Sequence, residues 1–401
     1  MHNKQQFCRP LCTVVARATF YGLCVLMMIG SFATAQPGTL ESSQPCSGPP
    51  IKGLLDSPQE RFDQCRTGFN PYEFVLSTGT VSRLSLHWQY ATGSNVYTSP
   101  VVANGVLYIG SDDHSLYALN VGTGALLWKY TTGSTIRSSV AVANGVVYVG
   151  GVDDNFYALN AGTGALLWSF TTGAAIVSSP VVTNGLVYFA STDNNVYALN
   201  ARTGARAWKY TATDGFGASP SIANGVLYIG GFNDNVYALN AATGALLWQY
   251  TTGSYMYSAA AVANGVVYIG SYDNNVYALN ASTGALVWKY TTGAFVGASP
   301  AVANGVVYAA SGDGNVYALN AATGALMWTY PTGIAVLSSP TVANGVLYIG
   351  SDDDAVYALN ANSGVLLWQY PMGGDIDSSP VVINGMLYVG CADRRVYAFG
   401  L

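Results

Sequence analysis

The eight tryptophans of the chain recur at intervals of forty residues. They are Trp88, Trp128, Trp168, Trp208, Trp248, Trp288, Trp328 and Trp368. Self-similarity at such a period is the signature of a repeat architecture, in which copies of one supersecondary unit pack on their neighbours. Because the repeat fills residues 81–401, we read this region as one large domain that follows an N-terminal extension.

One repeat reads as four short strands separated by tight turns. In the first complete copy these strands, here called A to D, are expected at 99–103, 106–110, 116–120 and 126–130. Asn104-Gly105, between A and B, is the strongest short hairpin signal, because both central residues of a type I′ turn need positive φ. The strands are rich in β-branched and aromatic residues, and a sheet of this size cannot bury both faces alone. Stacking the copies around an axis buries these faces, so we expect a β-propeller rather than a linear β-solenoid.

Counting the motifs gives the number of blades. Eight Asn-Gly turns accompany the eight Trp strands. The repeat region does not begin and end with a complete unit. It begins with a lone D-like strand at 86–90, and it ends after a strand C at 396–399, so the last blade lacks a strand D of its own. We therefore predict an all-β, eight-bladed β-propeller of four-stranded antiparallel blades. Pairing of the N-terminal strand, within 84–90, with residues 395–399 of the last blade closes the ring.

Residues 118–128 read A-x-N-x-x-T-G-A-x-x-W, and close variants of this motif recur until Trp368. The motif resembles the tryptophan-docking motif of quinoprotein (pyrroloquinoline quinone, PQQ) propellers, A-x-D-x-x-T-G-K-x-x-W. The resemblance spans residues 81–401 and implies an eight-bladed PQQ-like propeller in which the docking tryptophans pack between blades. Among non-enzymatic members, the chain is similar to BamB-like assembly propellers and to secreted PQQ-repeat proteins. It lacks the lipid-anchoring cysteine of the former.

The resemblance covers the fold and not the family's active-site residues. Family enzymes stack the quinone on a tryptophan and use an adjacent-cysteine disulfide, Glu and Asn ligands for Ca²⁺, and an Asp base. In this chain every tryptophan occupies a docking position, no two cysteines are adjacent, and residues 81–401 contain no Glu. We therefore assign no catalytic, cofactor-binding or metal-ligating residue. Binding of PQQ with Ca²⁺ stays an open alternative that no residue supports.

Comparison of the internal copies identifies one face on which they differ. The A–B and C–D turns share one face of a propeller and hardly vary here, and we call it the Asn-Gly face. The D–A links and B–C turns share the opposite face, here called the variable face, where the copies diverge. Loops on a rigid scaffold commonly carry specificity, so we assign ligand binding to the variable face.

The candidate ligand-binding residues on the variable face fall into two sectors. The aromatic sector, in blades four and five, comprises Phe216, Phe232, Tyr255, Tyr257 and Tyr272. The charged sector, in blades seven, eight and one, comprises Asp352, Asp354, Asp375, Asp377, Arg394, Arg395, Asp112 and His114. Tyr97 and Arg137 occupy the strand-A position of Tyr257 in their own blades. Aromatic and charged walls suit a peptide or a sugar-like ligand. The alternative is neutral variation on a solvated rim whose charges aid solubility.

A carboxylate recurs in the B–C turn of seven copies, and Asn233 replaces it in the fourth. A Ca²⁺ site needs about six to eight oxygen ligands, and each copy offers one short turn, so we expect these Asp side chains to cap turn N–H groups. Asp375 and Asp377 flank one residue and point the same way from a strand. We favour a solvated pair over catalytic paired carboxylates. His114 has no second His or Cys near it in sequence that would complete a metal site.

The first 35 residues read as an export signal. Basic residues precede an apolar run at 20–32, and Ala33-Thr34-Ala35 forms an A-x-A cleavage site. An uncleaved anchor is the alternative, although the run is shorter than the roughly 20 residues of a membrane span. After cleavage no stable membrane span remains.

Three cysteines follow the cleavage site. In an oxidising compartment Cys46 and Cys65 are able to pair within the extension, residues 36–80, and staple a Pro-rich stretch that lacks a core. Cys391 is expected to be a buried single thiol.

Composition narrows the classes of function. A net charge of −5 with 9% charged residues lacks the basic footprint of a nucleic-acid-binding protein. We predict an exported monomer, periplasmic, extracellular or associated with the cell envelope. Its function is to bind a protein or peptide through the variable face without catalysis. A degenerate PQQ-dependent dehydrogenase and a structural envelope protein without a defined ligand are the alternatives.

Overall fold

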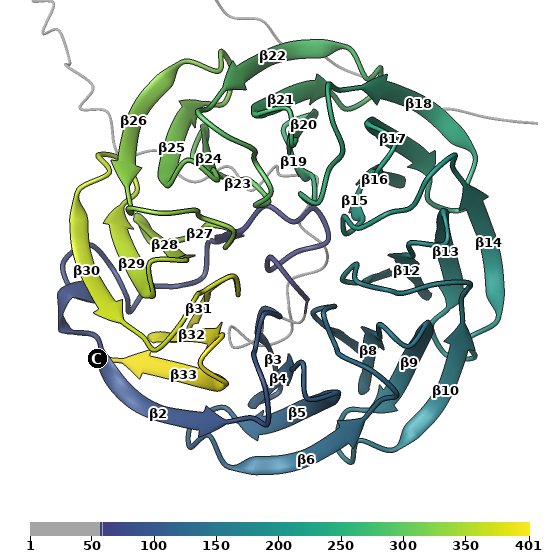
Figure 1. Cartoon of the computed structure of the whole chain (residues 1–401), viewed down its shortest axis with the longest axis horizontal. Coiled ribbons are helices and arrows are strands. Elements are labelled where there is room, and N and C mark those ends of the chain that lie inside the picture. The colour runs from purple at the N-terminus through teal and green to yellow at the C-terminus, as the bar shows by residue number, and fades with distance from the viewer. Residues whose placement is uncertain (1–56, 58) are drawn as a thin grey trace, which may run out of the picture. The chain divides into compact units, whose positions relative to one another are not determined.

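The computed structural model describes residue 57 and residues 59–401, which form a ring of β-sheets around a central axis (Figure 1). The expected export signal and Cys46 lie outside the described residues. The described part contains one short 3-10 helix, η1 (Val81–Arg83). No helix in this part has the length and apolar character needed to cross a membrane.

Eight four-stranded antiparallel blades surround the axis, and in blades one to seven the four strands are neighbours in chain order. Blades one to four comprise β3 (Val101–Ala103), β4 (Val106–Gly110), β5 (Ser115–Asn120), β6 (Leu126–Thr131); β7 (Ala141–Ala143), β8 (Val146–Gly150), β9 (Asn155–Asn160), β10 (Leu166–Thr171); β11 (Val181–Thr183), β12 (Leu186–Ala190), β13 (Asn195–Asn200), β14 (Arg206–Thr211); β15 (Ser221–Ala223), β16 (Val226–Gly230), β17 (Asn235–Asn240) and β18 (Leu246–Thr251). Blades five to eight comprise β19 (Ala261–Ala263), β20 (Val266–Gly270), β21 (Asn275–Asn280), β22 (Leu286–Thr291); β23 (Ala301–Ala303), β24 (Val306–Ala310), β25 (Asn315–Asn320), β26 (Leu326–Pro331); β27 (Thr341–Ala343), β28 (Val346–Ser351), β29 (Ala355–Asn360), β30 (Leu366–Pro371); β31 (Val381–Ile383), β32 (Met386–Cys391), β33 (Arg395–Gly400) and β2 (Ser85–Ala91).

The eighth blade confirms the predicted ring closure. Its three inner strands are β31 to β33, and its outer strand is β2, from the start of the repeat region. β2 runs antiparallel to β33, from Ser85 opposite Gly400 to Ala91 opposite Arg395. The two ends of the repeat region are therefore joined by sheet hydrogen bonds.

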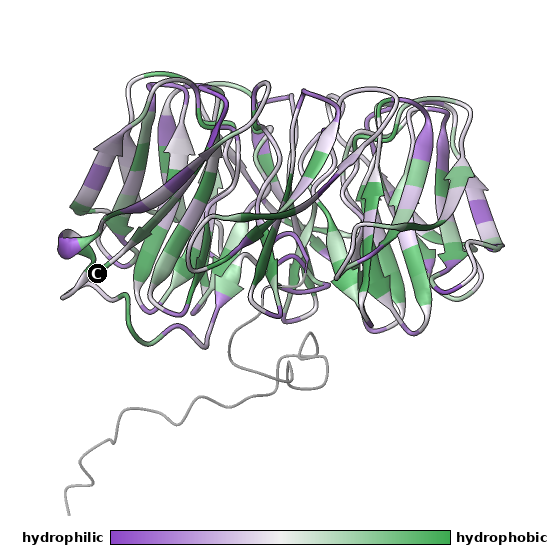
Figure 2. Ribbon diagram, turned by 90° about the horizontal axis from the view of Figure 1, so that it is seen from below, coloured by the Kyte–Doolittle hydropathy of each residue, from purple (hydrophilic) through white to green (hydrophobic). Residues whose placement is uncertain are grey.

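The turns confirm the hairpin prediction. All eight Asn-Gly pairs have positive φ at both residues, as in Asn104 at 51° and Gly105 at 76°. In the side view the strands stand between two opposite rims of turns (Figure 2). The A–B and C–D turns meet on one rim, where the N–H of Val121 donates to the carbonyl of Gly105. The B–C turns and D–A links meet on the other, where the N–H of Asp112 donates to the carbonyl of Asn95.

Each tryptophan reaches from the outer strand of one blade to the next blade. Nε1 of Trp128 donates to the carbonyl of Ala161 at 2.9 Å. The other seven indoles make equivalent bonds of 2.9–3.2 Å, the last of them from Trp368 to Leu84 across the closure. In six junctions a strand-B tyrosine donates to the same carbonyl, as Tyr108 does to Ala161 at 3.1 Å. One backbone oxygen therefore accepts two side chains of the neighbouring blade.

The core lies between adjacent blades and not inside any one of them. The apolar residue before each strand A is at most 1% exposed, as expected from its alternation with the variable positions. These residues are Val96, Ile136, Ile176, Phe216, Met256, Val296, Val336 and Ile376. Phe216 therefore belongs to the core and not to the aromatic sector on the surface, to which the sequence analysis assigned it.

The docked indole leaves no room for a side chain in the C–D turn. Two glycines of blade four have the same left-handed backbone, but only one of them contacts an indole, so comparing them distinguishes a steric clash from backbone strain. At Gly244 (φ 74°) a Cβ would lie 2.6 Å from Cε3 of Trp208, whereas at Gly225 (φ 75°) it would meet nothing within 4 Å. Left-handed backbone costs either alanine variant about 1–2 kcal/mol. We predict that Gly244→Ala lowers the free energy of unfolding by a further ~1–3 kcal/mol, because it also displaces the ring. Equilibrium chemical denaturation measures both variants, and equal losses would contradict the packing argument.

Candidate binding face and the filled channel

The central channel is filled by the chain's own residue 57 and residues 59–76, here called the plug (Figure 1). Its backbone pairs with the innermost strands around the ring, at Val102, Ala141, Ile222, Val262, Val302 and Val342. β1 (Phe69–Asn70), within the plug, runs parallel to β27. Inner strands would otherwise present unpaired N–H groups to the channel, and the plug satisfies them.

Two buried arginines of the plug cap carbonyl groups of the innermost strands. The guanidinium of Arg61 donates to Pro340 at 2.8 Å and to Pro300 at 2.6 Å. The guanidinium of Arg66 donates to Pro220 and Ser179, each at 2.7 Å. Burial lowers the pKa of Arg61 to about 10. Burial also lowers the pKa of Arg66, an effect that the adjacent Glu60 carboxylate opposes.

The exit of the plug is fixed by Asn70 and Glu73. The side-chain amide of Asn70 donates to the carbonyl of Val382 at 2.8 Å. The Glu73 carboxylate accepts the N–H groups of Gly385 at 3.0 Å and of Leu76 at 2.9 Å. With these contacts in blade eight, the plug is bonded to every blade of the ring.

The plug holds its backbone in a conformation that its residues disfavour. Arg61, Phe62 and Arg66 have φ values of 64°, 76° and 51°. Residues other than glycine are strained at positive φ, and they keep this conformation only where contacts with the rest of the structure hold them in it. Here the hydrogen bonds of the two guanidinium groups supply those contacts.

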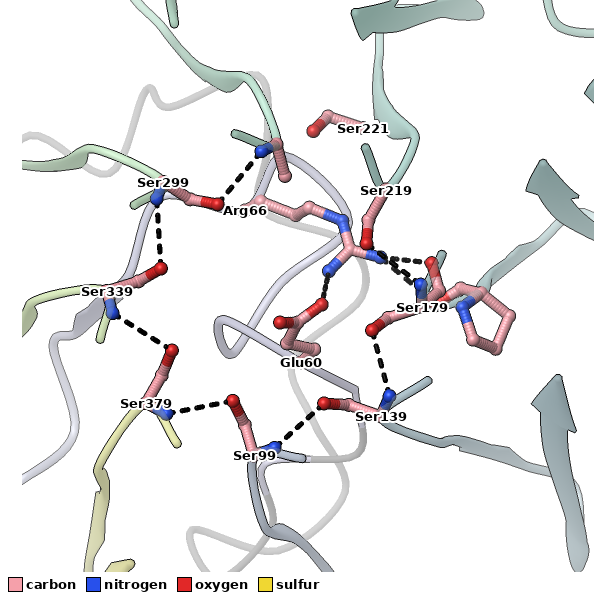
Figure 3. A network of polar contacts seen from close by, with 12 residues as sticks. Glu60, Arg66, Ser99, Ser139, Ser179, Ser219, Ser221, Ser299, Ser339 and Ser379 are labelled. Atoms are coloured by element: carbon pink, nitrogen blue, oxygen red, sulfur yellow. Dashed lines mark hydrogen bonds and ion pairs between the residues drawn. The ribbon is translucent and has the colours of Figure 1, made fainter. Parts of the chain in front are cut away.

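Serines at the start of strand A form a hydrogen-bonded ring beside the plug (Figure 3). In seven of the eight blades the backbone N–H at this position donates to the Oγ of the serine one blade further on, with Ala259 as the donor in blade five. Seven such bonds span 2.8–3.2 Å. The bond from Ser219 to the next blade is missing because Ala259 has no hydroxyl. The guanidinium of Arg66 joins this ring through the carbonyl of Ser179.

The space left around the plug is small. The cavity bordered by Arg61, Phe62, Asn70, Ser99 and Thr341 has a volume of about 10 Å³. Such a volume holds about one water molecule, whereas sites for small organic ligands measure several hundred Å³. A ligand of cofactor size therefore does not fit in this cavity.

The structure brings the surface members of the aromatic sector together and adds Phe295 to them. Tyr272 stacks on Tyr255 at a centroid distance of 4.4 Å and on Phe295 at 4.6 Å. Phe232 packs against Tyr257 at 5.0 Å. Tyr255 and Tyr257 remain 37% and 47% exposed. Burial, with the neighbouring tyrosines, raises the pKa of Tyr272 to about 12.

The sequence carried a signal for the fifth ring. Phe295 occupies the variable position of the link that enters blade six, two residues before Gly297. A Cβ at Gly312, in the adjoining B–C turn, would lie within 3 Å of the Phe295 ring. Gly312 therefore leaves the space that the Phe295 ring fills. In the sequence, a large residue at one position of the repeat is accompanied by the smallest residue at a neighbouring position.

Part of the charged sector forms a closed ion pair. Nε and Nη2 of Arg137 donate to the two carboxylate oxygens of Asp112 at 2.6 and 2.7 Å. The guanidinium lies 4.5 Å from the ring centroid of Tyr97, whose hydroxyl accepts the amide of Asn95 at 2.8 Å. These residues, from blades one and two, hold one another in place.

A second part of the charged sector is a carboxyl pair across two blades. Burial, repulsion from Asp377 and a hydrogen bond with Asp377 raise the pKa of Asp352 to about 7. Burial also raises the pKa of Asp377. The two side chains therefore share a proton near neutral pH. The partner of Asp377 is Asp352 from the neighbouring B–C turn, and Asp375 is exposed.

The remaining sequence candidates are separate surface groups. His114, Asp354 and Arg394 are exposed at left-handed turn positions, with φ of 68°, 64° and 72°. Arg395 pairs with Asp393 at 3.2 Å. Within residue 57 and residues 59–401, no group of three or more His, Cys, Asp or Glu is arranged to hold a metal ion.

The recurring Asp of the B–C turn caps turn N–H groups, as expected. Asp113 accepts the N–H groups of Gly93 at 2.7 Å and of Ser115 at 3.0 Å, and the hydroxyl of Tyr117. Cys391 is a free buried thiol. Cys65 is disulfide-bonded, and the partner predicted for it lies outside the described residues.

The fold and its docked tryptophans define a propeller of the quinoprotein-like repeat class. Residues 74–139, 122–259, 233–341 and 333–400 match the family model described as outer membrane protein assembly factor BamB. These matches cover most of the chain, so it belongs to this family of PQQ-type repeat propellers. A search of curated proteins finds no significant match.

Solved structures with the same fold include catalytic and non-catalytic proteins. BamB from Moraxella catarrhalis is 19% identical with a TM-score of 0.69, covering 79% of this chain and 100% of that one. A europium-containing methanol dehydrogenase is 15% identical with a TM-score of 0.75, covering 87% and 99%. The computationally designed Ika8 protein is 17% identical with a TM-score of 0.71, covering 79% and 98%. At these identities the likeness establishes the fold alone.

The arginine caps make the plug a structural part of the ring. We predict that Arg66→Ala lowers the free energy of unfolding by about 3–5 kcal/mol, because it leaves Glu60 and the strand carbonyls without their buried partner. The exposed Arg394→Ala is the control and is expected to change it by less than about 0.5 kcal/mol. Equilibrium denaturation measures both. Equal stability of the two variants would show that the plug lies in the channel without supporting it.

The carboxyl pair makes stability depend on pH. The pKa of Asp352 is about 7 in the folded state and about 3.9 in an unfolded chain. Between these values the folded state binds the extra proton, so its contribution to stability falls as pH rises through this window. We predict that Asp352→Asn raises the free energy of unfolding at pH 8 by on the order of 1 kcal/mol, after solvent screening, and changes it little at pH 4.

Thermal unfolding across this pH range tests the carboxyl pair. The exposed Asp354→Asn, two residues away, is the matched control and should leave the pH profile unchanged. If Asp352→Asn stabilised the protein equally at pH 4 and at pH 8, the two carboxyl groups would not share a proton.

Proposed function

We propose that this protein is an exported, non-catalytic binding propeller that captures a basic polypeptide on its variable face. The observation that carries the proposal is the cluster of five aromatic rings on that face, in which Tyr255 and Tyr257 are exposed and the others are packed around them. Tyrosines held rigidly by neighbours are favoured contact residues, because little side-chain entropy is lost when they bind.

The charge of the variable face supports a basic partner. All fifteen Asp of residues 81–401 lie in B–C turns or D–A links. The basic side chains of the variable face are Arg137, Arg394 and Arg395, and two of them, Arg137 and Arg395, form ion pairs with Asp. A face of one sign attracts partners of the other sign and speeds their encounter. Aromatic rings beside carboxylates suit Lys and Arg side chains flanked by apolar residues.

The residues of the channel support a function without PQQ. Each of the eight indoles donates to a carbonyl of the next blade, which leaves none to carry a quinone. The carboxylates of Glu60 and Glu73 are bonded to Arg66 and to backbone N–H groups. The plug fills the central channel, and the indoles and carboxylates are engaged in these contacts, so the described residues do not fit the cofactor and no catalytic step is assigned.

The family supports a place in the cell envelope. Its model is named for an outer membrane protein assembly factor. The predicted export signal at residues 1–35 is consistent with such a location. Capture of a basic polypeptide in the envelope is thus the function that we propose.

Peptide binding tests the proposal. Fluorescently labelled peptides that carry Lys and Arg beside aromatic residues are titrated against the protein, with acidic peptides of equal length as the control. We predict saturable binding of the basic peptides. Affinity falls at least about tenfold in the Tyr255→Ala and Tyr257→Ala double variant, because truncating aromatic anchors costs about 2 kcal/mol or more. The exposed Tyr72→Ala, on the Asn-Gly face, is the matched control and leaves affinity unchanged.

Two outcomes would contradict the proposal. Equal binding by the double variant and by wild type would place the site elsewhere. Absence of peptide binding, combined with a thermal shift or dye-linked alcohol oxidation on addition of PQQ and Ca²⁺, would favour the dehydrogenase alternative.

A further inference from the structure

The two faces of the propeller differ in charge as well as in variability. The B–C turns and D–A links hold every Asp of residues 81–401. On the Asn-Gly face the exposed charged side chains are those of Arg83, Arg202 and Arg206. Among the described residues of this face, no Asp or Glu side chain is exposed. The Asn-Gly face is therefore nearly uncharged, with a small positive excess.

Apolar side chains protrude from this face where the plug leaves the channel. Phe74 is 72% exposed, Val75 49% and Tyr72 42%. The ring of Tyr72 lies 6.2 Å from that of Phe62, which is also partly exposed. The segment is fixed in place, because the Glu73 carboxylate between these residues accepts the N–H groups of Gly385 and Leu76. The backbone of this segment is therefore fixed by hydrogen bonds, while its large apolar side chains point into solvent.

A ring of exposed aliphatic pairs surrounds the same face. Each pair begins an outer strand directly after a C–D turn. In blades one, two, four, five and six both members are 44–51% exposed, at 126–127, 166–167, 246–247, 286–287 and 326–327. A β-bulge lies at the second member of each pair, as between Leu126 and Trp128, so two successive side chains face outward. Blade three interrupts the ring with Arg206 and Ala207.

The part of the chain that precedes the described residues joins the structure near this face. Ser57 pairs with Val102 and lies two residues from the Asn104-Gly105 turn in the strand register. The described chain therefore begins near the side where the protruding apolar side chains and the arginines lie.

We propose that the Asn-Gly face rests on the surface of an anionic lipid bilayer, with Phe74 and Val75 inserted at the interface. Amphipathic surfaces with aromatic and aliphatic groups on one side and cationic groups around them bind the headgroup boundary in this way. Arg83, Arg202 and Arg206 meet the lipid phosphates, and the aliphatic ring faces the headgroups. The acidic variable face then points away from a negatively charged surface and stays free for a polypeptide.

An environment-sensitive dye on each face tests this orientation in the full chain. One dye is attached at Thr78→Cys, beside Phe74, and the other at His114→Cys on the variable face. Cys8, Cys12 and Cys24 are changed to Ser in both labelled proteins, and Cys391 is buried and does not compete for labelling. With vesicles of phosphatidylglycerol and phosphatidylethanolamine we expect a blue shift and quenching by brominated lipid at position 78 and none at position 114. Vesicles of phosphatidylcholine alone give a weaker shift.

The double variant Phe74→Ser and Val75→Ser measures the contribution of the protruding side chains. We expect the apparent vesicle partition coefficient reported by the dye at position 78 to fall at least about tenfold, because each side chain loses most of its transfer free energy. Both proteins carry the same residues 1–56, so any anchoring by that segment is common to both. Equal melting temperatures exclude misfolding, and unchanged peptide binding on the variable face separates this test from the proposed function.

Several results would overturn the proposal. Equal shifts at positions 78 and 114, or an unchanged partition coefficient in the double variant, would exclude docking through this face. A shift at position 78 that grows with protein concentration without vesicles would assign the face to a second copy of the chain.

Discussion

The hydrogen bond from each indole to a carbonyl of the next blade is the contact on which the ring depends. A four-stranded sheet leaves an apolar face open, so each blade is completed only by its neighbour. The carbonyl of Ala161 accepts both Trp128 and Tyr108, which fixes the distance between two sheets at one point. The glycine of the C–D turn is required because the ring lies where a side chain would stand. Repetition of the motif thus follows from one contact made eight times.

This repetition explains why the sequence predicts the fold and only part of the site. Blade number, Asn-Gly turns and ring closure follow from local motifs, and local conformation agrees there with the tertiary contacts. The plug has no period, and Arg61, Phe62 and Arg66 adopt a left-handed backbone that their residue types disfavour. Its conformation is set by carbonyls of Pro220, Pro300 and Pro340 that lie far away in sequence. No local pattern encodes such a structure.

Site residues could be predicted where neighbours in sequence are neighbours in space. Tyr255 and Tyr257 lie on one link, and their proximity follows from strand geometry. The carboxyl pair escaped prediction because Asp352 and Asp377 come from a turn and a link that only the packing of blades seven and eight brings together. Phe216 is buried because it holds the strictly alternating apolar position before strand A, whereas its aromatic character alone wrongly predicts a surface site.

Departures from the repeat gather on one side of the ring. Blade five carries Ala259 and Ala260 where most blades have Ser-Pro, so the serine ring is open between Ser219 and Ala259. The same link carries Tyr255 and Tyr257 on the variable face. At this junction the hydroxyl of Ser221 donates instead to the carbonyl of Ala260, so the two blades remain joined by a side-chain hydrogen bond. Because the plug closes the channel, a ligand has to be held by the rim and not by a funnel. The link that carries the exposed Tyr255 and Tyr257 is then the part of the rim with the most aromatic surface to hold it.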